Sequence, residues 1–372
     1  MKILQINKLY APWVGGVETV ARDIASGLSM KDGIYIENLV CQSRGSYARD
    51  IIDDVVTHRA KSFGVFMGMP LSLQFFSLFR KMAQDFDVIL IHHPFPLACV
   101  AYWLFGRRKQ VVVWYHSDII RQKITRIFFQ PFLLFMLRRA RHIFVSNSRL
   151  VSYSPILKKF SDSCRIIYFG LKPEAYAQTP EIVQKAQDIR NIYGTPLILG
   201  VGRLIYYKGF EYLIRSIVSV PSVHVLIIGS GILHDKLISL AIHLGVSDRV
   251  HIIPSLISSH ELVPYYYACD IFAFPSCGNG EVFGITQAEA MMCGKCVINT
   301  NLPTGVPEVS VDGETGITVA IRDVEGFAKA IITLLNDDVL REKYAQAACQ
   351  KAHALFIYTR FIDEVEKYLK TM

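Results

Sequence analysis

The stretch PLILGVGRLIYYKGFEYLIRSIVSVPSVHVLIIG, residues 196–229, decides the fold. It begins with a short, almost continuously apolar run and ends with another, and each run stops at a glycine. The residues between the two runs, which include IYYKGFEYLIRSI, predict a helix. A strand, a helix and a second strand in this order predict two parallel strands joined by a crossover helix, which is the repeating unit of an α/β fold.

The same alternation extends in both directions along the chain. Apolar runs predict a first series of strands at 2–6, 87–91, 111–115 and 142–146, and a second at 196–202, 223–229, 248–254, 270–275 and 296–300. We therefore predict an α/β protein with two Rossmann-like, doubly wound parallel-sheet domains that face a central cleft, with ligands at the carboxyl ends of the strands. The predicted parts are an N-terminal domain (1–170), a linker (171–195), a C-terminal domain (196–355) and a final helix that packs back on the N-terminal domain (356–372).

The cations of the 372-residue chain are unevenly distributed. The net charge is +8, but residues 55–160 contain sixteen Lys or Arg and only three Asp, so this region carries +13 and the rest of the chain −5. Dense aromatic and aliphatic residues lie among these cations, as in AYWLFGRRK and RQKITRIFFQPFLLFMLRRAR. The combination predicts a domain that binds an anionic membrane surface. The alternative is that residues 128–137 are core and the arginines form a solvated face. Nucleic acid is not expected as a partner, because the sequence has no recognition module.

The N-terminal sequence and the cysteines indicate the cellular compartment of the protein. The N-terminal residues lack the long apolar core of a signal peptide, and the longest uncharged stretch, 88–106, contains two His and two Pro and does not fit a membrane span. The eight cysteines are scattered, and the single CxxC at 293–296 has no second pair for a structural zinc ion. We predict a cytoplasmic protein that lies peripherally on the inner face of the cytoplasmic membrane.

Two glycine-rich turns are candidate phosphate sites. Gly15 and Gly16 lie between the first strand and a predicted helix at 17–28, where the backbone can approach a phosphate at a helix N-terminus. A plain tight turn is an equal alternative. Arg203 and Lys208 follow the strand at 196–202, and two cations there suit a diphosphate, unless both are solvated surface residues. The chain has neither GxGxxG nor GxxxxGK[ST], which argues against a simple dinucleotide enzyme and a P-loop NTPase.

The segment FPSCGNGEVFGITQAEAMMCGKCVI, residues 274–298, contains two candidate carboxylates. Glu281 lies in a glycine-rich loop, where it can accept hydrogen bonds from sugar hydroxyls. The N–H groups of residues 283–285, at the start of the next helix, can hold a phosphate. Glu289 lies within that helix and can accept both hydroxyls of a ribose. The alternative is that Glu281 complements the helix dipole and Glu289 lies on a solvated face.

Together these motifs resemble the retaining glycosyltransferases of the GT-B fold, and specifically glycosyltransferase family 4. The resemblance covers essentially the whole chain. It rests on the Gly15-Gly16-Val-Glu turn, on GxGRL…KG, and on PSxxxxExFGxxxxEAMxCGK in the correct order after it. Among bacterial members, the tail at 302–319 looks like mannosyltransferases that assemble O-antigen or lipopolysaccharide.

The resemblance implies a role for each candidate residue. Arg203 and Lys208 would neutralise the donor diphosphate in place of a metal ion, Glu281 would hold hydroxyls of the donor sugar, and Glu289 would bind the ribose. His116 ends the strand VVVWYH, and a lone His there is usually structural, but the resemblance implies contact with the donor sugar. The remaining donor-binding candidates are Gly15 and Gly16, which would close on the donor phosphate or the acceptor, the backbone amides of Phe283, Gly284 and Ile285, and Ile253 within the expected base site at 252–256.

The implied activity is transfer, with retention of configuration, of a hexose to a lipid-linked (polyprenyl-diphosphate) saccharide acceptor in O-antigen or polysaccharide biosynthesis. Mannose from GDP-mannose is the preferred donor, and neither a cofactor nor a metal ion is expected. The alternatives are a UDP-sugar-dependent hexosyltransferase of the same fold, a GT-B sugar-nucleotide epimerase, and a catalytically dead membrane-bound subunit. The acceptor sugar, the linkage, the oligomeric state and the roles of His92 and His93 stay open.

Overall fold

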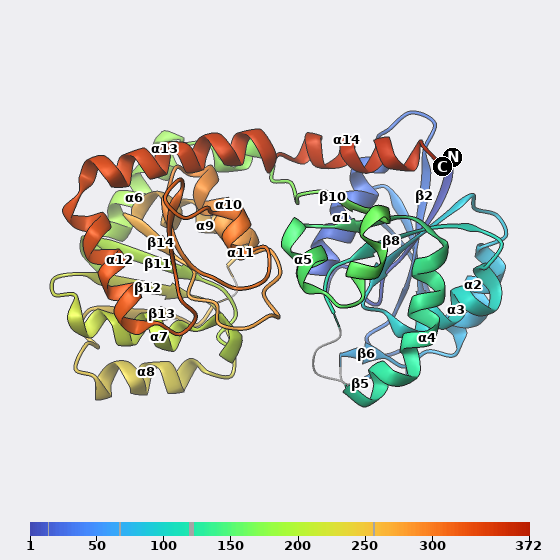
Figure 1. Cartoon of the computed structure of the whole chain (residues 1–372), viewed down its shortest axis with the longest axis horizontal. Coiled ribbons are helices and arrows are strands. Elements are labelled where there is room, and N and C mark those ends of the chain that lie inside the picture. The colour runs from blue at the N-terminus through green and yellow to red at the C-terminus, as the bar shows by residue number, and fades with distance from the viewer. Residues whose placement is uncertain (14, 67, 119–122, 256) are drawn as a thin grey trace. The chain divides into compact units, whose positions relative to one another are not determined.

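The computed structural model describes residues 1–13, 15–66, 68–118, 123–255 and 257–372. The chain divides into two compact units (Figure 1). Unit 1 contains Met1–Tyr168 and Phe361–Met372, and unit 2 contains Phe169–Arg360. Each unit is built on its own sheet of parallel strands, with one antiparallel edge strand in unit 1, and helices cover both faces, so the predicted α/β class with two doubly wound domains is confirmed.

Unit 1 is built around a sheet of parallel strands with one antiparallel strand at its edge. The strands are β1 (Lys2–Ile6), β2 (Tyr35–Cys41), β3 (Ala48–Ile52), β4 (Val55–Ala60), β7 (Val88–His93), β8 (Gln110–Tyr115), β9 (Ala140–Val145) and β10 (Cys164–Ile166), with β5 (Val65–Phe66) and β6 (Met69–Pro70) in a separate hairpin. Within the described residues the order is β10-β9-β8-β7-β1-β2-β4-β3, and β3 pairs antiparallel with β4. The central strands are buried on both faces because crossover helices cover them.

The helices of unit 1 are α1 (Gly16–Ser29), α2 (Gln74–Met82), α3 (Pro96–Ala101), the π-helical turn η1 (Tyr102–Gly106), α4 (Lys123–Arg139), α5 (Ser148–Tyr153) and the 3₁₀ turn η2 (Leu157–Ser163). Helices α2, α3 and α4 pack next to one another on one face, and α1 packs against β2 and β4 (Figure 1). The last helix, α14 (Tyr358–Leu369), places Phe361 in an edge-to-face contact with Trp114 at 5.7 Å. Residues 361–369 of α14 therefore pack on unit 1.

Unit 2 contains a sheet in which every described pairing is parallel. The strands are β11 (Leu197–Val201), β12 (His224–Ile228), β13 (Val250–Ile253), β14 (Ile271–Ala273), β15 (Val297–Thr300) and β16 (Gly316–Val319). In the described residues the order is β13-β12-β11-β14-β15-β16. The chain runs outward from β11 to β12 and β13 on one side, and returns to β14 on the other. The carboxyl ends of β11 and β14 therefore form a topological switch point, where α/β sheets bind ligands.

Helices cover both faces of the unit 2 sheet. Figure 1 shows α6, α9 and α10 on one side of the strands and α7 and α8 on the other. Their bounds, with those of the remaining helical segments, are η3 (Pro173–Tyr176), α6 (Pro180–Tyr193), η4 (Tyr206–Lys208), α7 (Phe210–Ser216), η5 (Ile217–Ser219), α8 (His234–His243), α9 (Ser259–Ala268), α10 (Ile285–Met292), α11 (Val306–Val309), α12 (Val324–Asn336) and α13 (Asp338–Leu355). Apolar side chains of α7, α8 and α12 form one core cluster with the strands.

Residues 171–195, expected as a linker, lie within unit 2 and contain η3 and α6. Arg190 of α6 donates hydrogen bonds to the carbonyl of Ala268 at 2.7 Å and to the carboxylate of Asp270 at 3.2 Å. Asp270 in turn accepts the backbone N–H of Leu197 at 2.7 Å. These bonds tie α6 to the starts of β11 and β14. The polar residues that suggested a linker therefore lie on the outer face of a packed helix.

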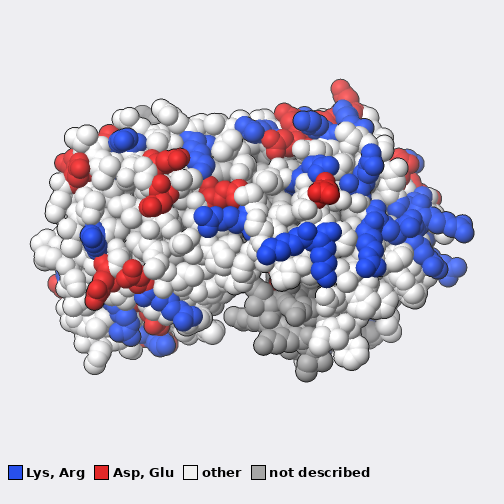
Figure 2. All heavy atoms as spheres, viewed as in Figure 1, with Lys and Arg blue, Asp and Glu red and all other residues white. Residues whose placement is uncertain are grey.

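The basic and aromatic region of unit 1 is partly core and partly surface. Leu133, Met136 and Leu137 are buried, as the alternative interpretation of 128–137 requires, but Phe128 is 71% exposed. Figure 2 shows Lys and Arg gathered over unit 1 on the side of α2 and α3, whereas both charge signs mix over unit 2. The side chains of Arg121, Lys123 and Arg126, which the sequence counted in this region, lie outside the described residues. No helix among the described residues is both long enough and apolar enough to span a membrane.

Candidate active site

The segment after β11 passes between the loops that follow β12 and β14. At Gly229, after β12, a Cβ atom would stand 1.9 Å from the carbonyl oxygen of Gly202. At Gly209, which has a φ of +69°, a Cβ atom would stand 2.0 Å from the carbonyl oxygen of Pro275. Glycine is therefore required at both places, because any side chain would push the loops apart. The close approach brings the 202–209 segment to the switch point of the sheet.

Lys208 and Glu281 meet at this switch point. The Lys208 Nζ lies 2.5 Å from Glu281 Oε2, and the two side chains are only 13% and 12% exposed. The ammonium group also lies 5.1 Å from the centre of the Phe274 ring. The sequence singled out both residues for separate roles, and the structure places them in one ion pair. An ammonium group has three donors, so Lys208 can bind Glu281 and an anionic ligand together.

Arg203 is exposed and is linked to the same loop through a tyrosine. Its guanidinium donates a 2.7 Å hydrogen bond to the hydroxyl of Tyr207. Tyr207 packs against the glycine-rich loop that holds Glu281: its carbonyl accepts the N–H of Cys277 at 2.7 Å, and its side chain lies against Gly278 and Gly280. Tyr207 was not a candidate from the sequence. The signal that could have identified Tyr207 is its position one residue before Lys208, opposite a loop with two glycines.

The N-terminus of α10 follows directly after this loop. Gly284 caps the helix in the left-handed conformation, with a φ of +82°, and its carbonyl accepts the N–H of Gln287 at 3.0 Å. The Phe283 side chain is buried between Phe169 and Phe356, with ring centres 5.0 and 5.6 Å away. Phe283 thus anchors the loop through its ring. A contact with a ligand through the amides of residues 283–285 remains a prediction.

Glu289 lies in the interior of unit 2 and is 3% exposed. Its carboxylate accepts hydrogen bonds from the hydroxyls of Tyr176, at 3.0 Å, and Tyr266, at 2.6 Å. Burial raises the pKa of Glu289, and the hydrogen bonds from hydroxyl groups oppose this rise. The solvated face that the alternative interpretation offered is therefore wrong. The sequence also missed both tyrosines, and binding of ribose by Glu289 remains a prediction.

Ile253 is the last residue of β13 and is half-buried. Its carbonyl accepts the N–H groups of Gly229, at 3.0 Å, and Ser255, at 2.9 Å. These bonds hold the end of β13 next to the end of β12. Leu256, the last residue of the expected base site, lies outside the described residues, and the base site itself remains a prediction.

In unit 1, Gly15 and Gly16 form the N-terminus of α1. Gly15 is the N-cap residue, in an extended conformation, and a Cβ atom on it would stand 2.3 Å from Glu18 Oε2. Glu18 is 5% exposed, and its carboxylate complements the positive end of the helix dipole. A Cβ atom on Gly16 would meet nothing within 4 Å. Space for a ligand is therefore greater at Gly16 than at Gly15.

His116 lies directly after β8 in unit 1 and is 6% exposed. Its backbone N–H donates to the carbonyl of His93 at 3.0 Å, which continues the pairing of β7 with β8. The His116 Nε2 lies 2.9 Å from Nδ1 of His92. Burial, together with His92, His93 and Lys8, lowers the pKa of His116 well below its ordinary value. At neutral pH His116 is therefore an uncharged imidazole.

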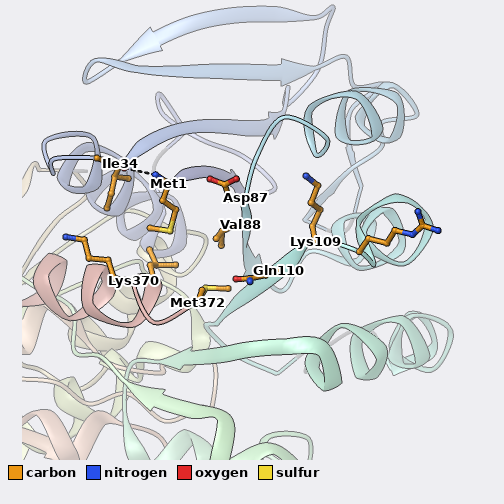
Figure 3. A pocket seen from close by; sticks show the side chains of 11 residues that line it. Met1, Ile34, Asp87, Val88, Lys109, Gln110, Lys370 and Met372 are labelled. Atoms are coloured by element: carbon orange, nitrogen blue, oxygen red, sulfur yellow. Dashed lines mark hydrogen bonds between the residues drawn. The ribbon is translucent and has the colours of Figure 1, made fainter.

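Among the described residues, neither a metal centre nor the cavity of unit 1 forms part of this candidate site. No group of three or more His, Cys, Asp and Glu side chains in the described ranges could hold a metal ion. A cavity of about 590 Å³ in unit 1 is lined by Met1, Asp87, Lys109 and Met372, among others (Figure 3). It lies at the amino ends of β1, β7 and β8, opposite His116. Its Lys109 ammonium already donates to two backbone carbonyls, at 2.9 Å each.

Two family models match the chain. The model described as "Glycosyltransferase Family 4" matches residues 14–153, and the model described as "Glycosyl transferases group 1" matches residues 184–351. The first match includes the Gly15–Gly16 turn and His116, and the second includes Arg203, Lys208, Glu281 and Glu289.

Curated relatives are similar over most of their lengths. The D-rhamnosyltransferase WbpZ of Pseudomonas aeruginosa is 29% identical over 96% of this chain and 92% of its own. The O-antigen chain mannosyltransferase C of Escherichia coli is 26% identical over 98% of this chain and 96% of its own length. A Campylobacter jejuni enzyme is 27% identical over 82% and 81%, and its name describes transfer of N-acetylgalactosamine to a diphospho-undecaprenol-linked sugar. The crystal structure of Anabaena HepE with UDP has a TM-score of 0.81 and 19% identity over the full length of both chains, which shows a common fold.

Proposed function

The chain belongs to glycosyltransferase family 4 and has the GT-B fold, and on this premise we propose that it transfers a hexose from a nucleotide diphosphate donor to a lipid-linked saccharide. The proposed reaction retains the configuration of the anomeric carbon and uses no metal ion. We place it in the assembly of O-antigen or lipopolysaccharide. This proposal draws on the similarity to two O-antigen and lipid-linked saccharide enzymes.

The observation that carries the proposal is the Lys208–Glu281 pair at the switch point of unit 2. A departing nucleoside diphosphate needs positive charge at its phosphates, and a sugar ring needs acceptors for its hydroxyls. Lys208 supplies the positive charge and Glu281 supplies the acceptors. The Lys208 Nζ and the Glu281 Oε2 lie 2.5 Å apart. Arg203 adds a second cation on the same segment, with a planar guanidinium that can bind phosphate oxygens in pairs. Stabilisation of the leaving diphosphate would be the main contribution of the protein to catalysis.

For the donor sugar we propose mannose, carried by GDP. Two of the relatives are named for the transfer of mannose and of D-rhamnose. D-Rhamnose is 6-deoxymannose, so both sugars share the axial hydroxyl at C2. A site that recognises this common configuration accounts for both names, and we assign the recognition to Glu281, because a carboxylate can accept hydrogen bonds from hydroxyls.

For the acceptor we propose a polyprenyl-diphosphate saccharide at an anionic membrane surface. The π-helical turn η1 exposes three consecutive apolar side chains, Trp103, Leu104 and Phe105, by 37–40% each. Arg107 lies over the Trp103 ring at 6.0 Å and Arg80 over the Phe105 ring at 5.7 Å. Exposed apolar groups flanked by arginines suit the interface of an anionic leaflet, where aromatic rings enter the headgroup region and cations bind phosphates. We name these residues, with Arg108, the basic–apolar surface.

The experiment that tests this function uses radiolabelled GDP-mannose, UDP-glucose and UDP-galactose, each incubated with the protein and total membrane lipid. We expect label from GDP-mannose in the lipid fraction. Label from a UDP-sugar alone would contradict the proposed donor and support the UDP-dependent alternative. Conversion of a sugar nucleotide to its epimer, without label in lipid, would contradict transfer itself.

A further inference from the structure

Arg322 has a backbone conformation that its residue type rarely adopts. It lies in the turn between β16 and α12, with a φ of +65°. Glycine, asparagine and aspartate are the usual residues at such a position, because a Cβ atom there crowds the backbone. The other non-glycine residues with positive φ in the described ranges have short polar side chains: Asp53, Asp54 and Ser222. The backbone cost at Arg322 is therefore offset by contacts of its long side chain.

The Arg322 guanidinium contacts two loops of unit 2. Its central carbon lies 5.6 Å from the centre of the Tyr206 ring. Burial raises the pKa of the Cys277 thiol, and a hydrogen bond from the Arg322 guanidinium opposes this rise. Tyr206 begins η4, two residues before Lys208, and Cys277 lies four residues before Glu281. One side chain of the β16–α12 turn therefore touches both segments that carry the Lys208–Glu281 pair.

The two segments are joined beneath Arg322 by hydrogen bonds of Cys277. Its backbone N–H donates to the carbonyl of Tyr207 at 2.7 Å, and its thiol donates to the carbonyl of Tyr206 at 3.3 Å. The sulfur atom can accept the Arg322 N–H while its own proton binds the Tyr206 carbonyl. Cys277 is 5% exposed, but Tyr206 is 51% exposed. Arg322 thus adds a contact to a ring that is otherwise half open to solvent, and a cation over an aromatic ring is attracted to it.

We propose that Arg322 is a positioning residue, which holds the turn carrying Lys208 against the loop carrying Glu281. The inference rests on the proposed function, in which this pair acts on the nucleotide-sugar donor, and it extends the site to a third loop of unit 2. Arg322 needs no contact with the donor for this role, because it acts through Tyr206 and Cys277. When the two segments move apart, the ammonium and carboxylate groups no longer meet at 2.5 Å. Removal of the guanidinium therefore weakens catalysis without removing a group that binds the donor.

Hydrogen exchange on the free protein, followed by mass spectrometry, tests the positioning directly. The amide of Cys277 reports on the junction, because it is bonded to the Tyr207 carbonyl. Arg322→Gly removes the guanidinium with a residue that suits the turn, and it should raise the exchange rate of this amide on the order of tenfold. Ser222→Gly is the matched control, since Ser222 has a φ of +59° in a different turn, before β12, and it should leave this rate unchanged. An unchanged rate in Arg322→Gly, or an equal rise in both variants, would overturn the proposal, whatever the enzyme transfers.

A kinetic comparison separates positioning from overall stability. Arg322→Gly should lower kcat/KM for the donor on the order of tenfold, while its midpoint of urea unfolding stays close to that of the parent, because glycine relieves the turn. Arg322→Lys, which keeps a cation that can lie over the Tyr206 ring, should recover most of the lost kcat/KM. Equal losses in both variants, or a kcat/KM within twofold of the parent in Arg322→Gly, would overturn the positioning role. If no donor supports transfer at all, the proposed function fails, while hydrogen exchange still decides whether Arg322 holds the junction.

Discussion

The carboxylate of Glu289 is enclosed in unit 2 and accepts the hydroxyls of Tyr176 and Tyr266. Because burial raises its pKa above the ordinary value of 4.5, ionisation of Glu289 opposes folding. A raised pKa in the folded state means that the stability from the protonated group is present at low pH and is lost as pH rises through the folded pKa. The tyrosines offset part of this cost, because each donates to the charged form.

The first prediction concerns Glu289→Gln, which removes the titration but keeps a carbonyl acceptor. The free energy of unfolding of this variant, relative to the parent, should increase as pH rises from below 4.5 toward 8. Urea unfolding at several pH values measures the difference. Glu325→Gln, at an exposed position of α12, is the control and should show no such rise. A difference between Glu289→Gln and the parent that stays flat across this range would contradict an ionisation cost at Glu289.

At the scale of elements, the turn from η4 to α7 positions Lys208, and Gly209 is the residue that permits it. Gly209→Ala would place a Cβ atom 2.0 Å from the carbonyl of Pro275, in addition to the cost of a φ of +69°. We expect a loss of roughly 3 kcal/mol or more in the free energy of unfolding, because backbone must shift. We also expect weaker donor binding, because Lys208 moves with the turn.

Gly245→Ala is the matched control for this prediction. Gly245 has the same φ of +69°, but a Cβ atom on it meets nothing within 4 Å. This variant should lose only about 1 kcal/mol, the cost of the left-handed conformation itself. Equal losses in the two variants, measured by urea unfolding, would show that contact with Pro275 does not matter.

The strands show which elements a sequence can reveal. All nine predicted strands are present. Eight of them lie inside their sheets, where burial on both faces favours a nearly continuous apolar run, and the ninth, β13, lies at an edge. The edge strands β3, β10 and β16 were missed, and so were β2, β4 and the two hairpin strands β5 and β6. Polar residues interrupt several of them, as in YIENLVC of β2, so the apolar run is not continuous. The segment with α6 was assigned to a linker for the same reason: its polar residues dominate the composition, whereas its buried contacts come from a few residues such as Ala186 and Ile189.

The position of a candidate residue was predictable where that position depends on its neighbours in sequence. Arg203, Lys208 and Glu281 lie in short motifs beside strand ends, and sequence order places them near one edge of the sheet. The Glu289–Tyr176 and His92–His116 contacts join residues that are 113 and 24 positions apart. Such pairs depend on sheet register and helix packing, which short motifs in the sequence do not reveal.

At the scale of the whole molecule, the basic–apolar surface predicts binding to anionic lipid. Replacement of Arg80, Arg107 and Arg108 by Glu should weaken sedimentation with phosphatidylglycerol vesicles on the order of a hundredfold or more, since each cation contributes about 1 kcal/mol. The control reverses three exposed lysines of unit 2 (Lys185, Lys236 and Lys329), which makes the same change in net charge. An equal loss in both triple variants would mean that net charge, and not this surface, governs binding.

The central claim is that Lys208 and Glu281 act together on the nucleotide-sugar donor, and a double-mutant cycle on the rate of label transfer from GDP-mannose tests it most directly. Lys208→Gln and Glu281→Gln should each lower the rate by about a hundredfold or more. The double variant should lose little beyond the worse single variant, because the two groups act as one unit. Lys236→Gln, at an exposed lysine, should leave the rate unchanged. Rates within tenfold of the parent in either single variant, or losses that multiply in the double variant, would contradict the account.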